Sequence, residues 1–398
     1  MDESGEATMA AGAAGAAEAA GAPARAAGRA AGRAVWDPAI RLFHWLLVVL
    51  VGTELATGLF VRRLALGLHL AAGTAIAALL LFRLVWGFFG PTYARFASFA
   101  HSPRAALAHL RALRAGRAAR HLGHNPLGAM MVFAFFAVLA ALVATGLVTL
   151  GGELKQGPLA PFLTYATGNT VRYLHLALAL ALAAMIAAHL GGVLFESLRE
   201  RENLARAMID GRKSPGPSIT ARAVRARPAL AALLLLAGGG GIGAGVWRLA
   251  ALPGRGVPPV VLDHTYAHEC GACHFAYPPS LAPWATWKGI LAHLGHHFGE
   301  DASLDPATVR HLGAYLRANS AGHWDSLPAV RLRTGQNPAD PLRITATAFW
   351  QHIHRHVPAA VFHSKAVGSP AACNACHHDA ASGLFAPQAI AIPEPAHR

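Results

Sequence analysis

The chain has 398 residues, of which 54% are hydrophobic and only 14% are charged. This composition excludes an ordinary soluble globular protein and makes a membrane protein the first expectation. A net charge of +14 would suggest nucleic-acid binding in a soluble protein, whereas in a membrane protein excess Lys and Arg usually sets the topology.

Residues 1–34 form a tail rich in Ala and Gly with scattered Arg. The tail lacks the continuous apolar run of a cleavable secretory signal, so we expect it to be disordered. Five apolar segments follow, each near or above the roughly twenty residues that cross a bilayer. They cover residues 38–60, 65–90, 126–150, 170–196 and 228–251. The first four predict a four-helix transmembrane domain over residues 35–198, and the fifth predicts a separate transmembrane helix over residues 228–251.

Lys and Arg gather in alternate connections between these spans. They are frequent before the first span, between the second and third, and in the linker at residues 199–227 between the fourth and fifth. By the positive-inside rule, the N-terminus and this basic linker are cytoplasmic. Five crossings of a bacterial inner membrane then place residues 252–398 in the periplasm. Because topology accounts for the basic residues, we expect no binding to nucleic acid.

Residues 252–398 have the composition of a soluble domain, with Pro, His, Trp and charged residues returning. Segments 284–298 and 306–318 are predicted to be helical, the second beginning after a capping Asp305 with Pro306 at the first helical position. The remainder shows little strand signal. The sequence therefore predicts an all-α fold with a mainly helical, loop-rich periplasmic domain.

The four cysteines all lie in two pentads of one pattern, CGACH and CNACH. In a Cys-x-x-Cys-His pentad the two thiols bond the haem vinyl groups, and the histidine becomes the proximal ligand of the iron. A zinc site would need further ligands nearby, and a disulfide would not explain the histidine. We therefore predict two covalent c-type haems. The attachment residues are Cys270, Cys273, Cys373 and Cys376, and the proximal ligands are His274 and His377.

Each iron has a sixth position, and residues 252–398 contain no methionine that could fill it. Histidine is the expected ligand, with Lys288 and Lys365 as less favoured choices. Two histidine clusters supply candidates: His293, His296 and His297 for the first haem, and His352, His354, His356 and His363 for the second.

The fourth span carries His175 and His189 in YLHLALALALAAMIAAHL. Fourteen helical residues advance about 21 Å and come within about 40° of four full turns, so both rings lie on one face at two depths. Span one contains His44 near its cytoplasmic end, and span two contains His69 near its outer end. Depth pairs His44 with His189 and His69 with His175, the arrangement expected for two b-type haems with two histidine ligands each.

Proton-relay histidines or a zinc pathway are the alternatives for these four residues. Zinc transport would recruit more carboxylates than the first four spans offer, namely Glu54 and Glu196 at the margin. Arg41 and Arg172 each precede a ligand histidine by three residues, so they are candidates to pair with haem propionates or to anchor the membrane interface. His124 is expected to be a structural or interfacial histidine rather than a ligand.

The segments VWDPAIRLFHW, HLAAG, FRLVWGFFGP and GHNPLGA, together with the paired histidines of span four, resemble the bacterial cytochrome b561 family. This family includes the b-type cytochrome subunit of nickel–iron hydrogenases, and the resemblance covers about residues 35–212. It implies four helices, two b haems with ligands on helices one, two and four, and electron exchange with the quinone pool. The implied ligands are His44, His69, His175 and His189.

The C-terminal part is similar to the dihaem cytochrome c (DHC) family, from HECGACHFAYPPS through HHFGEDASLDP and QHIHRHVP to CNACH. This resemblance, over about residues 255–390, implies two haems with two histidine ligands each and electron transfer to a small periplasmic haem protein. Its patterns favour His297 and His354 as the distal ligands, although His352 and His356 flank the second.

The two resemblances together predict an electron-transfer protein that takes electrons from quinol through two b haems and two c haems to a soluble periplasmic cytochrome or haem protein. No residue is predicted to be catalytic, because the only bond-breaking chemistry required is the oxidation of quinol with release of its protons. Reverse flow, from a periplasmic dehydrogenase or hydrogenase to quinone, uses the same parts. Two further functions are compatible with the residues: a terminal enzyme with an open c haem that binds O₂, and a haem-free metal sensor or transporter.

Overall fold

The structure, a computed structural model, describes residues 32–61, 65–214, 217–258 and 262–393. It is mostly helical, and five of its helices are long and apolar enough to cross a membrane. The predicted all-α fold with five such helices is therefore confirmed. These helices are α3 (Pro38–Ala56, extended by a π-helical turn η1 at Thr57–Val61), α4 (Leu66–Phe89), α6 (Pro126–Glu153), α7 (Tyr165–Glu200) and α9 (Pro228–Ala250).

The chain divides into two compact units, each described by itself below. The first unit comprises Met1–Val49, Ala78–Ala137 and Leu182–Leu236, and the second comprises Leu50–Ala77, Val138–Ala181 and Ala237–Arg398. The predicted domain boundaries stay predictions. Most of the tail predicted to be disordered, residues 1–31, lies outside the described residues.

In the first unit, an Asx-Pro pair begins two of the long helices. Oδ1 of Asp37 accepts from the backbone N–H groups of Ala39 and Ile40 at the start of α3, and Oδ1 of Asn125 accepts from Gly128 at the start of α6. The proline that follows each Asx residue has no backbone N–H to satisfy, and its φ angle suits the first helical position. Residues at the start of each helix therefore determine where it begins. The short elements of this unit are α5 (Pro103–Arg114), α8 (Leu204–Asp210) and the antiparallel pair β1 (Arg33–Ala34) and β2 (Arg212–Lys213).

His124 lies in the aromatic core of the first unit. Its ring is 4.8 Å from that of Trp36 and 4.7 Å from that of Phe99, measured between centroids. Burial, together with nearby cations of which Arg83 is the first, lowers the pKa of His124 to about 3, so its ring is neutral. These contacts agree with the structural role expected for His124.

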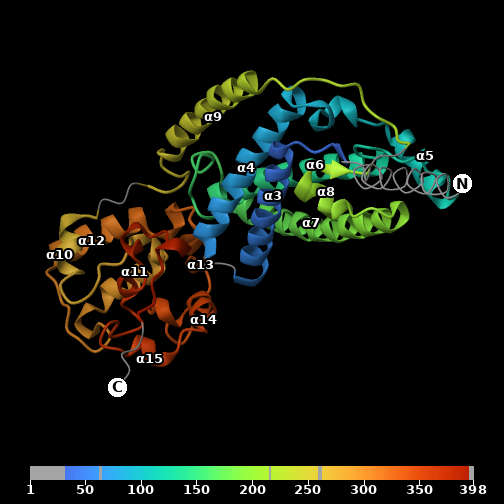
Figure 1. Cartoon of the computed structure of the whole chain (residues 1–398). Coiled ribbons are helices and arrows are strands. Elements are labelled where there is room, and N and C mark those ends of the chain that lie inside the picture. Colours follow the sequence, from blue (N-terminus) through green and yellow to red (C-terminus); the bar gives the residue numbers. More distant parts are fainter. Residues whose placement is uncertain (1–31, 62–64, 215–216, 259–261, 394–398) are drawn as a thin grey trace, which may run out of the picture. The chain divides into compact units, whose positions relative to one another are not determined.

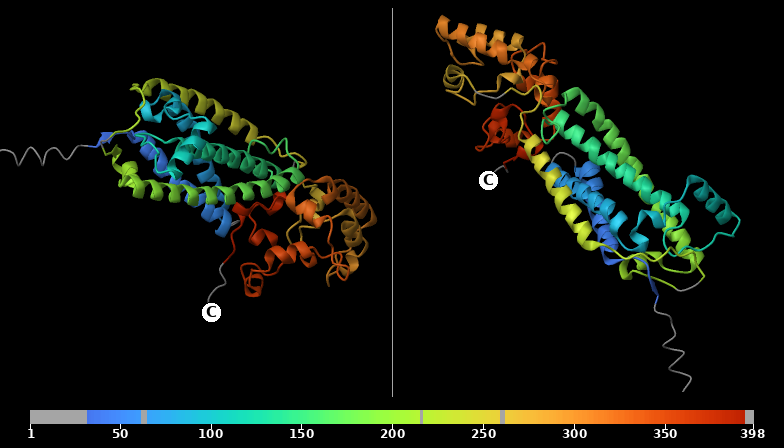
Figure 2. Two further views of the ribbon diagram at one scale, coloured as in Figure 1. Left: turned by 90° about the vertical axis from the view of Figure 1, so that its right-hand side faces the viewer. Right: turned by 90° about the horizontal axis from the view of Figure 1, so that it is seen from above.

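In the second unit, α6 and α7 form a hairpin closed by residues 154–164, and Figure 2 shows the two green helices running side by side. Gly152 and Gly168 allow the close approach. A Cβ atom on Gly152 would lie 2.6 Å from the backbone nitrogen of Gly168. Because Ala at either position would force the helices apart, glycine sets the spacing of this hairpin.

The C-terminal part of the second unit consists of short helices joined by long loops, coloured orange to red in Figure 1. Its core contains the buried Tyr266, Trp287, Leu312 and Leu316. The α-helices are α10 (His264–Glu269), α11 (Trp284–Ala292), α12 (Pro306–Asn319), α13 (Leu327–Leu332), α14 (Ala348–His354) and α15 (Ala359–Phe362). Short 3₁₀ turns of the chain are η3 (Thr92–Ala94), η4 (Phe96–Ser98), η5 (Pro279–Leu281), η6 (Leu294–His296), η7 (Ala321–His323), η8 (Ile344–Ala346), η9 (Cys373–Ala375), η10 (Ala380–Ser382) and η11 (Pro387–Ala389).

The helix predicted over residues 284–298 ends earlier than expected, at Ala292. The chain then turns, with φ of 55° at Phe298 and 108° at Gly299. The helix itself ends because His293, with φ of −126° and ψ of 28°, leaves the helical range, and the short turn η6 lies between it and Phe298. The angle at Gly299 strongly favours glycine. The helix predicted from residue 306 is present as α12, and Oδ1 of Asp305 caps it by accepting from Ala307 and Thr308.

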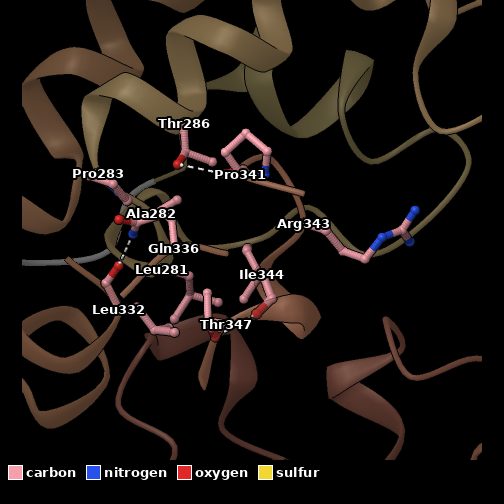
Figure 3. A pocket seen from close by; sticks show the side chains of 10 residues that line it. All are labelled: Leu281, Ala282, Pro283, Thr286, Leu332, Gln336, Pro341, Arg343, Ile344 and Thr347. Atoms are coloured by element: carbon pink, nitrogen blue, oxygen red, sulfur yellow. Dashed lines mark hydrogen bonds between the residues drawn. The ribbon is translucent and has the colours of Figure 1, made fainter. Parts of the chain in front are cut away.

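A small cavity in the C-terminal part lies between the start of α11 and the segment from Pro341 to Thr347 (Figure 3). It has about 10 Å³ of free space, roughly enough for a single water molecule. None of its lining residues is a histidine or a cysteine. The cavity is therefore separate from the residues predicted to hold haem.

Candidate haem-binding sites

The two Cys-x-x-Cys-His pentads lie at short helical turns of the C-terminal part. Cys270 ends α10, and Cys373 begins η9. All four cysteines are free thiols in the structure. Burial raises the pKa of both Cys270 and Cys373 to about 11, so neither is a preformed thiolate. Unpaired thiols at this spacing fit covalent attachment to a porphyrin.

Two imidazoles that bind one iron from opposite sides have a defined separation. A bond of about 2.0 Å from metal to nitrogen, plus about 1.1 Å from nitrogen to ring centre, gives about 6.2 Å between ring centroids. Three of the four predicted histidine pairs match this value.

The first pair joins the pentad histidine His274 to His297, with ring centroids 6.1 Å apart and planes 26° from parallel. Nδ1 of His274 bonds to the carbonyl of Phe275 at 2.8 Å, which leaves Nε2 for a metal. The sharp turn at Phe298 and Gly299 directs His297 to this place. His297 is half-buried, whereas His293 and His296 are exposed. Burial, with a smaller effect of His274, lowers the pKa of His297 and favours the neutral ring that a metal requires.

The second pair joins His377 to His354, with ring centroids 6.1 Å apart. Nδ1 of His354 bonds to the carbonyl of Trp350 at 2.9 Å, and the Trp350 ring stacks on the imidazole at 4.2 Å. Burial lowers the pKa of both histidines. His354 is half-buried, whereas the other candidates of this cluster are exposed, namely His352, His356 and His363.

The third pair lies on two membrane helices: His69 of α4 and His175 of α7 have ring centroids 6.2 Å apart. Each Nδ1 lies against a threonine hydroxyl, Thr57 for His69 at 2.9 Å and Thr145 for His175 at 3.0 Å. Both hydroxyls donate to backbone carbonyls four residues earlier, so they accept from the imidazole N–H groups. Each ring therefore keeps Nε2 free for a metal.

A glycine follows each of these threonines and makes room for the imidazole. A Cβ atom on Gly58 would lie 3.3 Å from Cε1 of His69, and one on Gly146 would lie 3.3 Å from Cε1 of His175. These threonines and glycines were not among the residues predicted from the sequence. The sequence feature that could have indicated them is the tetrapeptide Ala-Thr-Gly-Leu, which occurs at residues 56–59 and again at residues 144–147.

The fourth predicted pair, His44 and His189, belongs to the first unit. Phe135 packs edge-on against His189 at 5.7 Å. Among the described residues, the buried Nδ1 of His44 has no hydrogen-bond partner. The pairing of His44 with His189 stays a prediction.

The two arginines considered for haem propionates make other contacts. Nη1 of Arg41 donates to the carbonyl of Ile209. Nε of Arg172 lies 3.2 Å from Oε2 of Glu153, and its guanidinium lies over the Tyr173 ring. The propionate role of both residues stays a prediction.

The connection between α6 and α7 also contacts the C-terminal part of the second unit, a feature that the sequence did not indicate. Nζ of Lys155 lies 2.8 Å from Oδ2 of Asp325, which also accepts from the backbone N–H of Tyr165 at 2.9 Å. The backbone N–H of Arg255 donates to the carbonyl of Ala160 at 2.9 Å. The C-terminal part is thus bonded to the loop that leads directly into the helix carrying His175.

Comparison with known proteins places both halves of the chain. Residues 35–211 match the family Prokaryotic cytochrome b561, and residues 266–385 match the family Dihaem cytochrome c. Through its C-terminal part the chain belongs to the dihaem cytochrome c family, and its N-terminal part is similar to the cytochrome b561 family. Two solved structures of the dihaem cytochrome c (DHC) of Rhodobacter sphaeroides are each 38% identical to it and match 32% of this chain. The match spans 99% of the first structure's chain with a TM-score of 0.25, and 98% of the second structure's chain with a TM-score of 0.28. A dihaem cytochrome c of Shewanella baltica shares 32% identity, covers 34% of this chain and 95% of its own length, and has a TM-score of 0.28. No curated protein matches the chain.

The protein is therefore a membrane electron-transfer cytochrome, in which a cytochrome b561 domain and a dihaem c domain occur in one chain. The families imply haems of both b and c type, and the paired histidines and free cysteines described above fit them.

Proposed function

We propose that this protein takes electrons from quinol in the bacterial inner membrane, conducts them through two b haems and two c haems, and passes them to a soluble periplasmic haem protein. Each iron would have two histidine ligands. The proposed pairs are His44 with His189, His69 with His175, His274 with His297, and His354 with His377. Cys270, Cys273, Cys373 and Cys376 would attach the c haems.

The observation that carries this proposal is the common separation of 6.1–6.2 Å in three histidine pairs, one on membrane helices and two in the dihaem c domain. Pairs of imidazoles at this distance suit a six-coordinate iron. Two protein ligands leave no open coordination position. The arrangement therefore supports electron transfer over O₂ binding at an exposed iron.

Haem, when bound, supplies a centre that accepts and releases single electrons without bond breaking. The residues of this chain hold it and set its surroundings. Thr57 and Thr145 fix the ring orientation and tautomer of the two histidines that they contact. Trp350 does the same for His354 through its carbonyl and its ring.

The proposed topology rests on the distribution of basic residues. The N-terminus and the linker at residues 199–227 would face the cytoplasm, residues 35–198 would form the b domain, and residues 252–398 would form the periplasmic c domain. The bond between Lys155 and Asp325 supports this arrangement, because it joins the c domain to a connection predicted to be periplasmic.

The proposal is tested by purifying the haem-loaded protein and measuring its haem content with the pyridine haemochrome assay. We expect equal amounts of b and c haem, only six-coordinate low-spin spectra, and reduction of all four haems by added quinol. Absence of b haem, or a five-coordinate c haem that binds CO, would contradict it. Reduction by a periplasmic donor and not by quinol would instead support flow toward quinone.

A further inference from the structure

Glu54 is a carboxylate within the first membrane helix, and it contacts a proposed haem ligand. Oε2 of Glu54 lies 2.7 Å from Nδ1 of His69, and the two side chains are 17% and 26% exposed. Among the described residues, its other oxygen, Oε1, is buried without a hydrogen-bond partner. Gly73 of α4 leaves the space for this oxygen, since a Cβ atom there would lie 3.4 Å away. An ionisable side chain at such a place is costly, which indicates a function for it.

The surrounding bonds assign the proton. Oγ1 of Thr57 donates its hydrogen to the carbonyl of Thr53 at 2.7 Å, so it can only accept from His69. With acceptors on two sides, Nδ1 of His69 carries the hydrogen and donates it, and the carboxylate is the nearer and stronger acceptor. Nε2 is left without a hydrogen and available to iron.

In the described part of the chain, no carboxylate oxygen lies within 4 Å of a ring nitrogen of another proposed ligand, although Asp379 interacts with His377 from further away. His175, the partner of His69, bonds only to the hydroxyl of Thr145 among side chains. His274 and His354 bond to backbone carbonyls, and the buried Nδ1 of His44 has no partner. Of the two proposed b-haem sites, the described residues thus place a carboxylate in contact with a ligand ring only at the site of His69 and His175.

We propose that Glu54 lowers the reduction potential of the haem held by His69 and His175 below that of the haem held by His44 and His189. By accepting the Nδ1 hydrogen, the carboxylate makes His69 a more basic ligand, and a more basic ligand stabilises ferric iron relative to ferrous iron. The redox step itself adds one electron to the iron and breaks no bond. This inference rests on the proposed function, because it requires the two b haems.

The difference in potential has a consequence for the proposed direction. Electrons moving outward from the His44–His189 haem to the His69–His175 haem would move to a lower potential. A membrane potential that is negative in the cytoplasm drives electrons outward and assists this step. Through Glu54, the rate of outward electron transfer would then depend on the membrane potential.

The test is a potentiometric titration of the full haem-loaded protein carrying Glu54→Gln. We expect the potential of one b haem to rise, such that its ratio of reduced to oxidised form at a fixed ambient potential increases at least tenfold, about 59 mV for a one-electron centre. The other three haems should not change. The low-spin electron paramagnetic resonance signal of the same b haem should shift. Thr145→Val, which removes the acceptor from His175 and leaves Glu54 in place, is the matched control and should change the ratio much less.

Glu54→Asp separates tuning from structure, since it keeps the charge and withdraws it from the ring. It should give a smaller rise than Glu54→Gln, with the haem retained. Unchanged potentials in a haem-loaded Glu54→Gln protein would overturn the proposal, as would loss of the haem from both variants, because Glu54 would then be structural. If the unaltered protein holds no b haem, the proposed function itself fails, which is a distinct result.

Discussion

The bond between Lys155 and Asp325 should control how firmly the dihaem c domain is attached to the connection between α6 and α7. The Lys155 side chain is 1% exposed and that of Asp325 is 31% exposed, with 2.8 Å between Nζ and Oδ2. Asp325→Ala would leave the ammonium group buried with the carbonyl of Leu163, at 2.9 Å, as its remaining partner. Breaking a fully buried pair costs about 3–5 kcal/mol.

For this pair we expect a smaller cost of about 2–3 kcal/mol, because Asp325 is partly exposed and Leu163 still accepts a hydrogen bond. At about 1.4 kcal/mol for each factor of ten, the ratio of attached to detached c domain should fall roughly 30- to 140-fold.

Hydrogen exchange measures this ratio at the backbone N–H of Arg255, which bonds across the same contact to Ala160. Exchange there should accelerate roughly 30- to 140-fold in Asp325→Ala, in proportion to the loss of attachment. Asp340→Ala is the matched control, because its ion pair with Arg343 is exposed and should contribute less than about 1 kcal/mol. The reasoning is refuted if exchange at Arg255 is the same in Asp325→Ala and in the unaltered protein.

Three further substitutions test individual sites. His297→Ala should convert one of the two c haems to a five-coordinate form that binds CO, whereas His296→Ala, at an exposed neighbour, should not; equal effects on the absorption spectrum would refute the assignment. His189→Ala should remove one b haem and leave the c spectrum intact, and a full complement of b haem in the haemochrome assay would contradict its role as a ligand. Gly168→Ala should lower the free energy of unfolding by about 1–3 kcal/mol, because its Cβ atom would lie 2.7 Å from the carbonyl carbon of Gly152 on α6. In the control Gly191→Ala, on the same helix, the Cβ atom meets nothing within 4 Å, so this change should be neutral or stabilising.

The sequence by itself determined the features that depend on neighbouring residues. Apolar length fixes the five spans, because the bilayer core demands it. The spacing of His175 and His189 fixes their common face, since both lie on one continuous helix. Each Cys-x-x-Cys-His pentad predicts covalent haem attachment and the proximal ligand from five consecutive residues.

Choosing the distal ligands from the residues alone left three or four histidines open in each cluster. Neighbouring positions on the chain differ mainly in where their side chains point, and that direction is set by long-range packing. His297 is directed inward by the turn at Phe298 and Gly299, and His354 is held by Trp350. The family patterns had favoured both, and the 6.1 Å separations add a physical reason.

Only the tertiary structure placed the groups behind the ligands. Glu54 was noticed as a rare carboxylate in a span, but its contact with His69 depends on how α3 and α4 pack together. Thr145 and Gly146 reach His175 from another helix in the same way. The partners of Arg172 and Lys155 are likewise 19 and 170 residues distant in the chain. Contacts of this kind arise from the packing of separate elements. The repeated Ala-Thr-Gly-Leu marks the threonines and glycines in the sequence, but it does not tell which histidines they contact.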